Sequence, residues 1–437
     1  MKGRRAFRAA LLHCLEDPGA GGDPRAVEYF DDGLLLVDDG LVSALGPAAE
    51  LLPSLGEDVQ LIEQPDQLIV PGLIDCHVHY PQLDIVASYG EQLLDWLNRY
   101  AYPAEMRFAD SEHARQLAAV FTTELLRNGT TTALVFATVH PGSADAIFEA
   151  AADRNMRLLA GKVLMDRHCP AELRDDADTA YRQSRELIEK WHGRDRLGYA
   201  ITPRFALTSS EAQLEAAGRL AAEFPDVHVH THLAENEQEV ALVAEQFSWS
   251  QSYLQVYERF GLVRERSVFA HCLHLDDGDR RRMAELGASI AFCPSSNLFL
   301  GSGLFDLHAA CKHSVRVGIG SDVGGGASLS LLRTLADGYK ALHLQAQPLP
   351  PFRALYLATL GAARALYLDD RIGNFGHGKE ADFIMLDGGR SPATRRRLAG
   401  TADVAEKLFA LLMLGDERNV AASYLLGEPA YVAEDSP

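Results

Sequence analysis

The sequence predicts an α/β protein in which a (β/α)₈ barrel is joined to a small β-sandwich domain built from both ends of the chain. Two observations predict the barrel: apolar strand-like runs alternate with amphipathic stretches, and there are eight such units. Strands that alternate with helices form parallel sheets, and eight units over roughly 250 residues close into a barrel. A third observation predicts the β-domain, because the two ends share short strand-like runs and turn signals around a different middle.

Eight apolar runs are the predicted barrel strands. They are residues 68–77, 132–136, 158–165, 199–205, 227–232, 268–273, 289–293 and 315–321. The helices expected between them include residues 112–127, 144–155, 179–192, 211–224 and 279–286. In a TIM-like barrel of this kind the active site lies at the C-terminal ends of the strands, so we expect functional side chains there.

Shorter runs at both ends of the chain are the predicted strands of the β-domain. Asp38-Asp39-Gly40 separates the runs 33–37 and 41–45, which is a typical hairpin signal. Further runs are residues 59–62 and 68–70 before the barrel, and 381–386, 423–426 and 430–432 after it. Isolated hairpins are barely stable, so we expect one composite domain of residues 1–70 and 375–437, with the barrel in residues 71–374.

Composition and charge exclude several classes of function. Hydrophobic residues make up 47% and charged residues 23% of the 437 residues, as in ordinary globular proteins. The net charge of −20 argues against nucleic acids and anionic membranes as partners, and no apolar run approaches the ~20 residues of a membrane span. The six cysteines are scattered without a Cys-x-x-Cys pair, which favours a reducing cytoplasm. We therefore expect a cytoplasmic protein that acts on a small molecule.

Four residues at predicted strand ends form a candidate zinc site. His77 and His79 are two apart at the end of the first barrel strand, so their side chains face the same way. His232 ends the fifth strand, and Asp322 follows the eighth. An aspartate after a strand is often a helix cap, but Asp322 is the carboxylate placed to complete the set. Three histidines and an aspartate with room for water make an open zinc site, which supplies hydroxide at neutral pH.

Two further residues at strand ends are candidates for proton chemistry. Glu235 lies three residues after His232, where a carboxyl group can lean over the site without binding the metal. His271 ends the sixth strand and can orient the water or stabilise developing negative charge. The fifth strand also carries His228 and His230 on the same face as His232, and we interpret both as interior packing residues.

From about residue 31 to its end, the chain resembles the amidohydrolase superfamily, and within it the guanine deaminase family. The broader resemblance rests on residues that match the superfamily's metal and catalytic pattern strand for strand: His77, His79, His232, His271 and Asp322. The narrower one rests on four longer stretches, residues 89–105, 202–208, 232–236 and 292–303. Relatives with two metal ions use a modified lysine at the end of the fourth strand. Arg204 stands there in this chain and cannot form the bridging carbamate, which favours a single metal.

The resemblance implies a homodimeric hydrolase that converts guanine and water to xanthine and ammonia. It also implies one zinc ion per chain, bound by His77, His79, His232 and Asp322. The positions that match the family's purine contacts are Gln82, Arg204, Phe205, His232 and Glu235. In the implied mechanism Asp322 accepts a proton from the water that attacks C2, Glu235 protonates a neighbouring ring nitrogen, and His271 holds the attacking oxygen.

Two alternatives stay open at this point. The chain could be a deaminase or chlorohydrolase of another heterocycle, such as oxidised guanine, a pterin or a triazine. It could also be a barrel that has lost catalysis and serves in assembly, against which the complete ligand set and Glu235 argue. Trp96 lies in an amphipathic stretch, and we interpret it as a core residue rather than a pocket residue.

Overall fold

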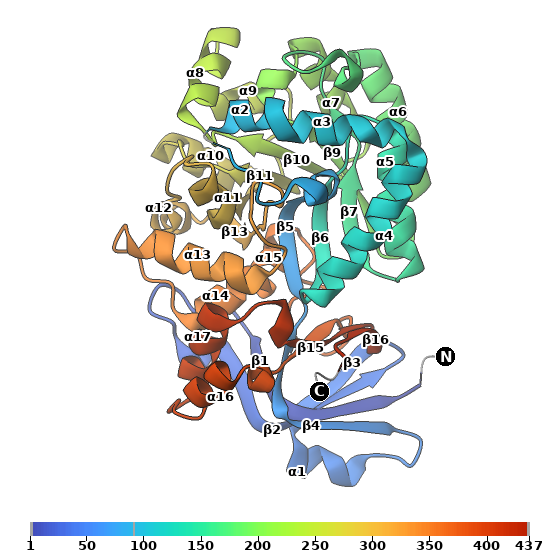
Figure 1. Cartoon of the computed structure of the whole chain (residues 1–437), viewed down its shortest axis with the longest axis vertical. Coiled ribbons are helices and arrows are strands. Elements are labelled where there is room, and N and C mark those ends of the chain that lie inside the picture. The colour runs from blue at the N-terminus through green and yellow to red at the C-terminus, as the bar shows by residue number, and fades with distance from the viewer. Residues whose placement is uncertain (1–2, 91, 435–437) are drawn as a thin grey trace.

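The computed structural model describes residues 3–90 and 92–434, so the outermost residues of both predicted ends, and Glu91 in the stretch 89–105, lie outside the described residues. Figure 1 shows a barrel in the upper part of the molecule and a separate sheet below it. This lower sheet contains strands from both ends of the chain. The predicted fold class is therefore confirmed as a parallel barrel with a β-domain assembled from both termini.

Eight parallel strands form the barrel. In spatial order they are β13 (Arg316–Ile319), β12 (Ser289–Phe292), β11 (Ser267–His271), β10 (His228–Leu233), β9 (Leu197–Pro203), β7 (Arg157–Gly161), β6 (Thr130–Phe136) and β5 (Leu73–His79), and the short β8 (Val163–Leu164) also pairs with β9. At the mouth, the residues after β13 join β5, because the Asp322 amide donates to the His77 carbonyl and the His79 amide to the Val323 carbonyl (2.9 and 2.8 Å). This junction brings the ends of the first and eighth barrel strands together.

Helices surround the barrel, and side-chain caps mark where several of them begin. Asp110, Asp176 and Ser210 each accept a hydrogen bond from a backbone amide in the first turn of the helix that follows. The helices are α4 (Ser111–Arg127), α5 (Pro141–Asp153), α6 (Ala177–Trp191), α7 (Glu211–Glu223), α8 (Glu237–Gln246), α9 (Tyr253–Arg259), α10 (Asp277–Glu285), α11 (Pro294–Phe299), α12 (Leu307–Lys312), α13 (Leu331–His343), α14 (Pro351–Ala358) and α15 (Leu360–Ala365). The short helices α2 (Leu93–Trp96) and α3 (Tyr102–Met106) cross above the barrel mouth (Figure 1). No helix in the described part of the chain is both long and apolar enough to cross a membrane.

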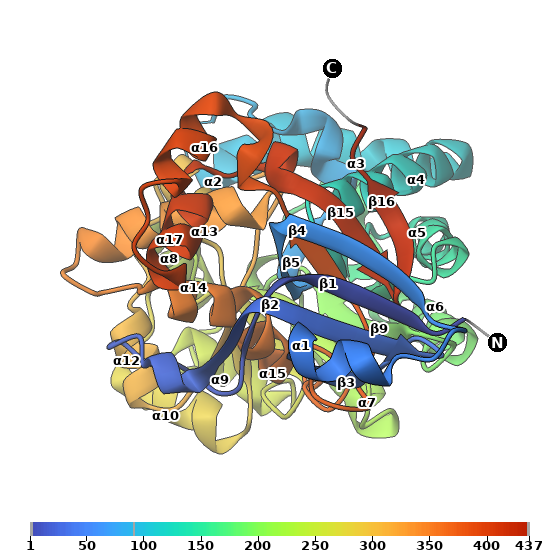
Figure 2. The same ribbon diagram turned by 90° about the horizontal axis from the view of Figure 1, so that it is seen from below.

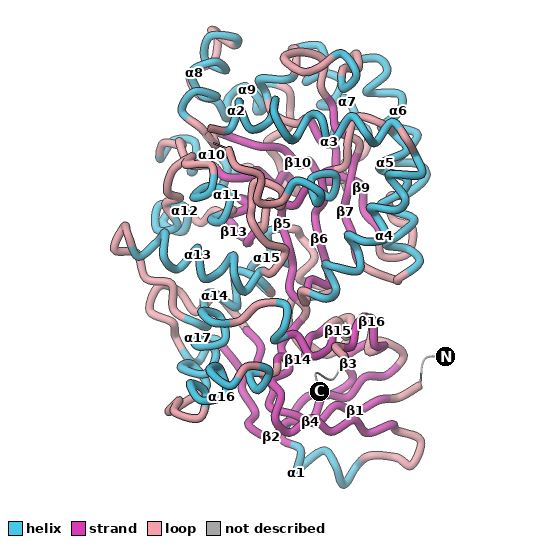
Figure 3. Tube along the Cα trace, in the orientation of Figure 1, coloured by secondary structure: helices cyan, strands magenta, loops and turns pink. Residues whose placement is uncertain are grey.

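The lower sheet is mixed and has seven strands (Figure 3). In spatial order they are β16 (Glu428–Val432), β15 (Val420–Leu425), β14 (Phe383–Leu386), β4 (Gln60–Pro71), β1 (Arg5–Cys14), β2 (Val27–Asp38) and β3 (Leu41–Pro47). The predicted hairpin is confirmed, because β2 and β3 pair across Asp39 and Gly40, both of which have positive φ. Sequence analysis did not assign β1, although it lies inside the sheet between β4 and β2. It also missed α1 (Ala48–Leu51), which packs against β2 and β3, and the helices α16 (Pro392–Leu398) and α17 (Val404–Leu414), which pack against each other.

The prediction of a single strand over residues 68–77 is wrong, because the chain changes sheets within that run. Residues up to Pro71 belong to β4 of the lower sheet, and β5 of the barrel begins at Leu73. Gly72 lies at the crossing, where a Cβ atom would be 2.0 Å from Thr131 Oγ1. Only a glycine fits this close approach without displacing Thr131, so the run looks continuous in the sequence but serves two sheets.

An apolar cluster fills the inside of the barrel and reaches α15. Ile74 and Cys76 of β5 belong to this cluster, together with residues of five other barrel strands and Ala362 of α15. The pairing of β5 with β6 shifts register between Asp75 and Val78, which is a bulge that interrupts strict alternation. Cys76 therefore faces the interior of the barrel although His77 and His79 follow it: a Cβ on Gly318 of β13 would lie 2.4 Å from its sulfur.

Candidate metal centre

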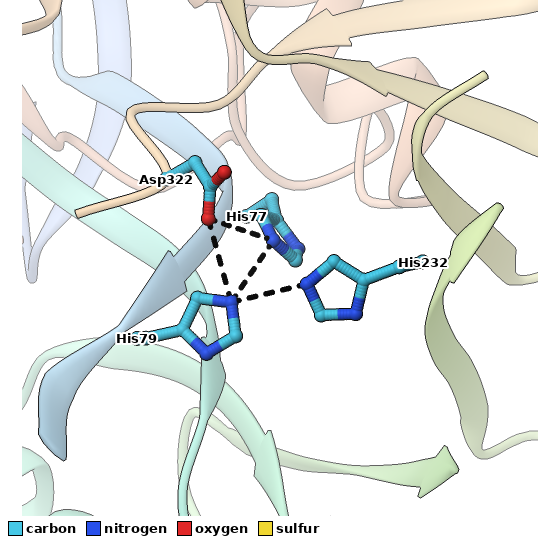
Figure 4. Close-up of side chains that lie close together, drawn as sticks. All are labelled: His77, His79, His232 and Asp322. Atoms are coloured by element: carbon cyan, nitrogen blue, oxygen red, sulfur yellow. Dashed lines mark hydrogen bonds and ion pairs between the residues drawn. The ribbon is translucent and has the colours of Figure 1, made fainter. Parts of the chain in front are cut away.

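Three imidazoles and one carboxylate meet at the barrel mouth (Figure 4). His79 Nε2 lies 3.2 Å from His77 Nε2 and 3.2 Å from His232 Nε2. Asp322 Oδ1 lies 3.1 Å from His77 Nε2 and 3.4 Å from His79 Nε2. Nitrogen ligands 2.0–2.1 Å from a tetrahedral zinc ion are about 3.3 Å apart from each other. The spacing of these four side chains therefore fits a zinc ion.

Hydrogen bonds on the far side of two rings fix which nitrogen faces the centre. His232 Nδ1 lies 2.6 Å from the backbone oxygen of Arg204, so Nδ1 carries the proton and donates it. His77 Nδ1 lies 2.7 Å from His230 Nε2. With Nδ1 of both rings turned away in this way, the Nε2 atoms of His77 and His232 both face His79, where they are placed to bind a cation. His230 is interior, as expected, but it also positions a proposed ligand.

Burial keeps these imidazoles neutral, which is the form that binds metals. Burial lowers the pKa of His79 to about 3 and also lowers the pKa values of His77 and His232. Burial alone would raise the pKa of Asp322, but the surrounding imidazoles outweigh it and hold the pKa of this carboxyl well below its usual range. Three neutral nitrogens and one carboxylate are the donor set of an open zinc site.

His271 lies between two carboxyl groups. Its Nε2 is 3.4 Å from Glu235 Oε2 and 3.6 Å from Asp322 Oδ2, and its Nδ1 is 2.8 Å from Asn297 Oδ1. Asn297 Oδ1 accepts a hydrogen bond from His271 Nδ1, which leaves Nε2 facing the centre. Burial raises the pKa of Glu235 well above its usual range, and the charge of Asp322 raises it further. Both effects favour the protonated form of Glu235, which has a proton to donate.

A second group of potential ligands overlaps the first. His271, Cys293 and Asp322 also offer atoms within 4.8 Å of one another. Burial raises the pKa of the Cys293 thiol well above its usual range, and metals bind the thiolate rather than the thiol. This burial favours the histidine-rich set as the metal centre.

Three strand ends turn through the left-handed backbone region, which non-glycine residues rarely adopt. The φ angles are 70° at His271, 48° at Asp322 and 51° at Ala234, directly before Glu235. Such residues persist where the surrounding structure holds them and gather at functional sites. Here the turns occur at the residues that present side chains to the barrel mouth.

A cavity of ≈30 Å³ lies beside the metal centre. Its lining includes His79, Gln82, Leu93, Trp96, Leu97, Arg204, Phe205, His232, Glu235 and Asp322. Our interpretation of Trp96 as a core residue alone is wrong: the residue is 2% exposed, yet it lines this cavity. The volume suits about two water molecules, so a larger molecule fits only after side chains of the lining move.

Glu105 holds two of the cavity residues, and sequence reasoning did not assign it a role. Its carboxylate accepts hydrogen bonds from Arg204 Nη1 (2.6 and 2.8 Å) and from Gln82 Nε2 (2.9 Å). Gln82 Oε1 in turn accepts from the Gly324 amide (3.2 Å). Both ends of the Gln82 amide are thus engaged by the protein. The signal for Glu105 was its place as the last residue of the distinctive stretch 89–105.

The loop that carries Glu235 is held by another buried acid. Glu239 Oε2 accepts hydrogen bonds from the amides of Glu235 (2.9 Å) and Asn236 (3.2 Å), and Tyr253 donates to its Oε1 (2.6 Å). The Asn236 side chain caps α8 in return. Ser302 donates to Glu235 Oε1 over 3.3 Å. These bonds fix where the Glu235 carboxyl points.

The structure brings every predicted site residue to one place. His77, His79, His232 and Asp322 form the metal centre, Glu235 and His271 lie beside it, and Gln82, Arg204 and Phe205 line the cavity. Sequence reasoning missed the supporting residues Glu105, Asn297 and Glu239. Glu105 and Asn297 lie in stretches singled out for resemblance, whereas Glu239 follows a turn and reads as an ordinary helix residue.

Comparison with known proteins identifies relatives over nearly the whole chain. Residues 68–425 match the amidohydrolase family. Guanine deaminase of Escherichia coli strain K12 is 48% identical over 406 residues, which cover 93% of this chain and 92% of that protein. The solved structure of E. coli guanine deaminase has a TM-score of 0.96 at 46% identity and covers 98% of this chain and 100% of that one.

Two further solved structures contain bound groups. Guanine deaminase from C. acetobutylicum, with guanine in its active site, has a TM-score of 0.88 at 25% identity and covers 98% of this chain and 100% of that one. An adenosine deaminase from Xanthomonas campestris with bound zinc has a TM-score of 0.84 at 26% identity and covers 97% of this chain and 92% of that one. The likeness thus includes proteins with a bound purine and with bound zinc.

Proposed function

Because the chain belongs to the amidohydrolase family, we propose that it is a guanine deaminase, which hydrolyses guanine to xanthine and ammonia. The observation that carries this proposal is the placement of Glu235, a buried carboxyl group, beside a three-histidine, one-aspartate centre in a cavity that also contains Arg204. The similarity to guanine deaminases over more than nine-tenths of the chain supports the choice of substrate.

We propose one zinc ion per chain, held by His77, His79, His232 and Asp322. The 3.1–3.4 Å spacing of their ligand atoms and the neutral state of the buried imidazoles support this assignment. When bound, the metal lowers the pKa of water to about 7 and so supplies a hydroxide nucleophile at neutral pH. Arg204, in place of a lysine at the end of β9, favours one metal over two.

The residues around this centre divide the proton transfers between them. Asp322, held as a carboxylate, accepts the proton of the attacking water and passes it to the amino group, which leaves as ammonia when its bond to C2 breaks. Glu235, whose protonated form burial favours, donates a proton to the ring nitrogen next to C2 as the carbon becomes tetrahedral, and regains one from the C2 hydroxyl group when the carbonyl of xanthine forms. His271 Nδ1 donates to Asn297, so its Nε2 accepts a hydrogen bond from the attacking water. Groups fixed in advance in this way stabilise charge where it develops.

We propose that Arg204, Gln82, Phe205 and His232 recognise the base. Arg204 has a rigid fork of donors suited to the carbonyl of guanine, and Glu105 fixes that fork by binding its Nη1 atom. Phe205 lines the cavity and offers a flat apolar face to a planar ring. Adenine has an amino group where guanine has its carbonyl, and an unmatched buried polar contact can discriminate by ~10⁴-fold or more.

The proposal can be tested by measuring ammonia release from purified protein. The substrates would be a panel of purines, pterins, triazines and pyrimidines. We expect guanine to be the preferred substrate by a wide margin over adenine. If another heterocycle were turned over faster than guanine, the substrate assignment would be wrong although the reaction class would survive. If no compound released ammonia from the metal-loaded protein, the proposal of catalysis would fail.

The proposal also includes a cytoplasmic homodimer, with a β-domain of residues 1–70 and 375–437 and a catalytic barrel of residues 71–374. The family resemblance supports the dimer, and the scattered cysteines support the compartment, because all six are free in the structure. Light scattering of the purified protein gives the number of chains per particle. A particle mass of 47.7 kDa would contradict the dimer.

A further inference from the structure

A second cavity lies at the opposite end of β13 from the metal centre. Its lining includes residues of α14 and α15, two helices that Figure 2 labels in the view from below. It measures ≈340 Å³, and four charged side chains line it: Arg316, Arg353, Arg364 and Asp17. Arg316 is the first residue of β13, Arg353 lies on α14, and Arg364 lies on α15. Asp17 comes from the connection between β1 and β2. The cavity is thus lined by Asp17, near the start of the chain, and by residues between positions 311 and 364.

Arg353 is a buried cation with too few acceptors. It is 5% exposed, and among the described residues its guanidinium makes one hydrogen bond, from Nη2 to Cys311 Sγ (2.9 Å). Its buried Nε has no hydrogen-bond partner, because Asp17 Oδ1, with which it forms an ion pair, lies 3.7 Å away, beyond hydrogen-bond distance. A guanidinium has five N–H donors, and burying a charge without acceptors is costly. The cavity therefore contains donors that the protein itself leaves unsatisfied.

The other charged groups around the cavity add to the positive charge. Arg316 makes no ion pair within the described residues, and its guanidinium lies 4.3 Å from the centre of the Tyr367 ring. Arg364 donates to the Tyr356 hydroxyl (3.3 Å) and lies 3.8 Å from Asp369 Oδ2. Three guanidinium groups thus face a single lining carboxylate, that of Asp17, in a chain whose net charge is −20. Such a local excess of positive charge attracts anions.

We propose that this cavity binds a phosphate group, either as the free ion or as part of a small organic phosphate. Arg353 would supply the buried donors, and Arg316 and Arg364 the donors at the rim. The planar fork of arginine matches phosphate oxygens in pairs. Leu357 and Val315 give the cavity an apolar wall, against which the organic part of a phosphate ester can lie.

Isothermal titration of the metal-loaded full-length protein tests the proposal, with inorganic phosphate and ribose 5-phosphate as separate probes at constant ionic strength. We expect at least one of them to bind at one site per chain, and the comparison decides between the free ion and an ester. Each lost charge-assisted hydrogen bond is worth about 1.5–3 kcal/mol, so Arg353→Gln and Arg364→Gln should each weaken binding by ~10-fold or more. Arg364 is 36% exposed, so its replacement remains informative if Arg353→Gln fails to fold.

Two controls separate this site from other sources of binding. Arg396→Gln removes an exposed arginine of α16, outside the cavity, and should bind phosphate as the wild type does. Turnover at the metal centre should be unchanged in Arg364→Gln, which lies at the other end of the barrel. The proposal is overturned if neither probe binds up to about 10 mM. It is also overturned if Arg353→Gln and Arg364→Gln bind as the wild type does, or if phosphate competes with guanine.

Discussion

Replacing Glu105 by glutamine tests whether this acid holds Arg204 in the cavity. Glu105 is 1% exposed and Arg204 is 2% exposed, and the carboxylate accepts hydrogen bonds from both Arg204 and Gln82. The substitution keeps the shape of the side chain but removes its charge, so the guanidinium stays buried without a counter-ion. Removing one partner of a buried ion pair costs about 3–5 kcal/mol of unfolding free energy.

The length of the chain determines how far this loss of unfolding free energy lowers the melting temperature. At about 2.1 cal/mol/K per residue, the unfolding entropy of the whole chain is ~0.9 kcal/mol/K, so a loss of 3 kcal/mol lowers the melting temperature by about 3 °C. Activity should fall as well, because a charge-assisted contact worth 1.5–3 kcal/mol corresponds to ~10–150-fold in kcat/KM for guanine. Calorimetry and steady-state kinetics on one metal-loaded preparation measure both effects.

A surface ion pair provides the matched control. Glu124 and Arg127 lie 3.3 Å apart with side chains 32% and 47% exposed, so Glu124→Gln should change the melting temperature by less than about 1 °C. The double variant Glu105→Gln with Arg204→Met should be less destabilised than the sum of the single variants, because it buries no unpaired charge. If Glu105→Gln melted within 1 °C of the wild type and kept its kcat/KM, this account of the pair would be refuted.

Three further predictions concern the metal centre and its support. Glu235→Gln should lower kcat by ~10²–10⁴ while metal content, measured on the same sample, stays at the wild-type level; loss of the metal would instead make Glu235 a ligand. Exhaustive chelation should abolish turnover, and elemental analysis of the restored enzyme should find one zinc per chain rather than two. Burial raises the pKa of Glu239 to about 7, above the 4.5 of an unperturbed glutamate. Its contribution to stability is therefore fully present below pH 4.5 and is lost as the pH rises through 7. In Glu239→Gln, melting temperatures measured from pH 5 to pH 8 should fall less steeply than in the wild type.

The sequence predicted the secondary structure best where one residue pattern corresponds to a single strand or helix. The alternation of apolar runs with amphipathic stretches predicted all eight barrel strands, and polar residues at the strand ends predicted which side chains meet at the barrel mouth. The run 68–77 was wrongly predicted as one strand because its two halves belong to different sheets. The boundary between β4 and β5 is marked by the close approach of Gly72 to Thr131, which is a tertiary contact. Strand β1 was missed because Arg8 and His13 interrupt its apolar pattern, and their partners Asp32, Glu63 and Glu28 are 15–55 residues away.

The supporting residues could not be assigned from sequence for a similar reason. Glu105 and Arg204 are 99 residues apart, and His271 and Asn297 are 26 apart. Neither pair has a fixed spacing that distinguishes it from surface residues of the same types. The meeting of the histidines and Asp322 was predictable because the barrel fold itself places the ends of parallel strands together. Glu105 and Asn297 lie on the short helices α3 and α11, whose positions follow from packing that the sequence pattern does not encode.

The joining of β4 to β14 in the lower sheet has a consequence for the synthesis of the protein. One edge of β4 pairs with β1, but its other edge pairs with β14, which begins at Phe383. At 5–20 residues per second, a ribosome needs roughly 15–60 s to make the roughly 300 residues between the two strands. During that time one edge of β4 stays unpaired and is open to association with other nascent chains. His77 and His79 of β5 follow β4 directly, so the strand that carries them is tethered to an unfinished sheet until roughly the last eighth of the chain emerges.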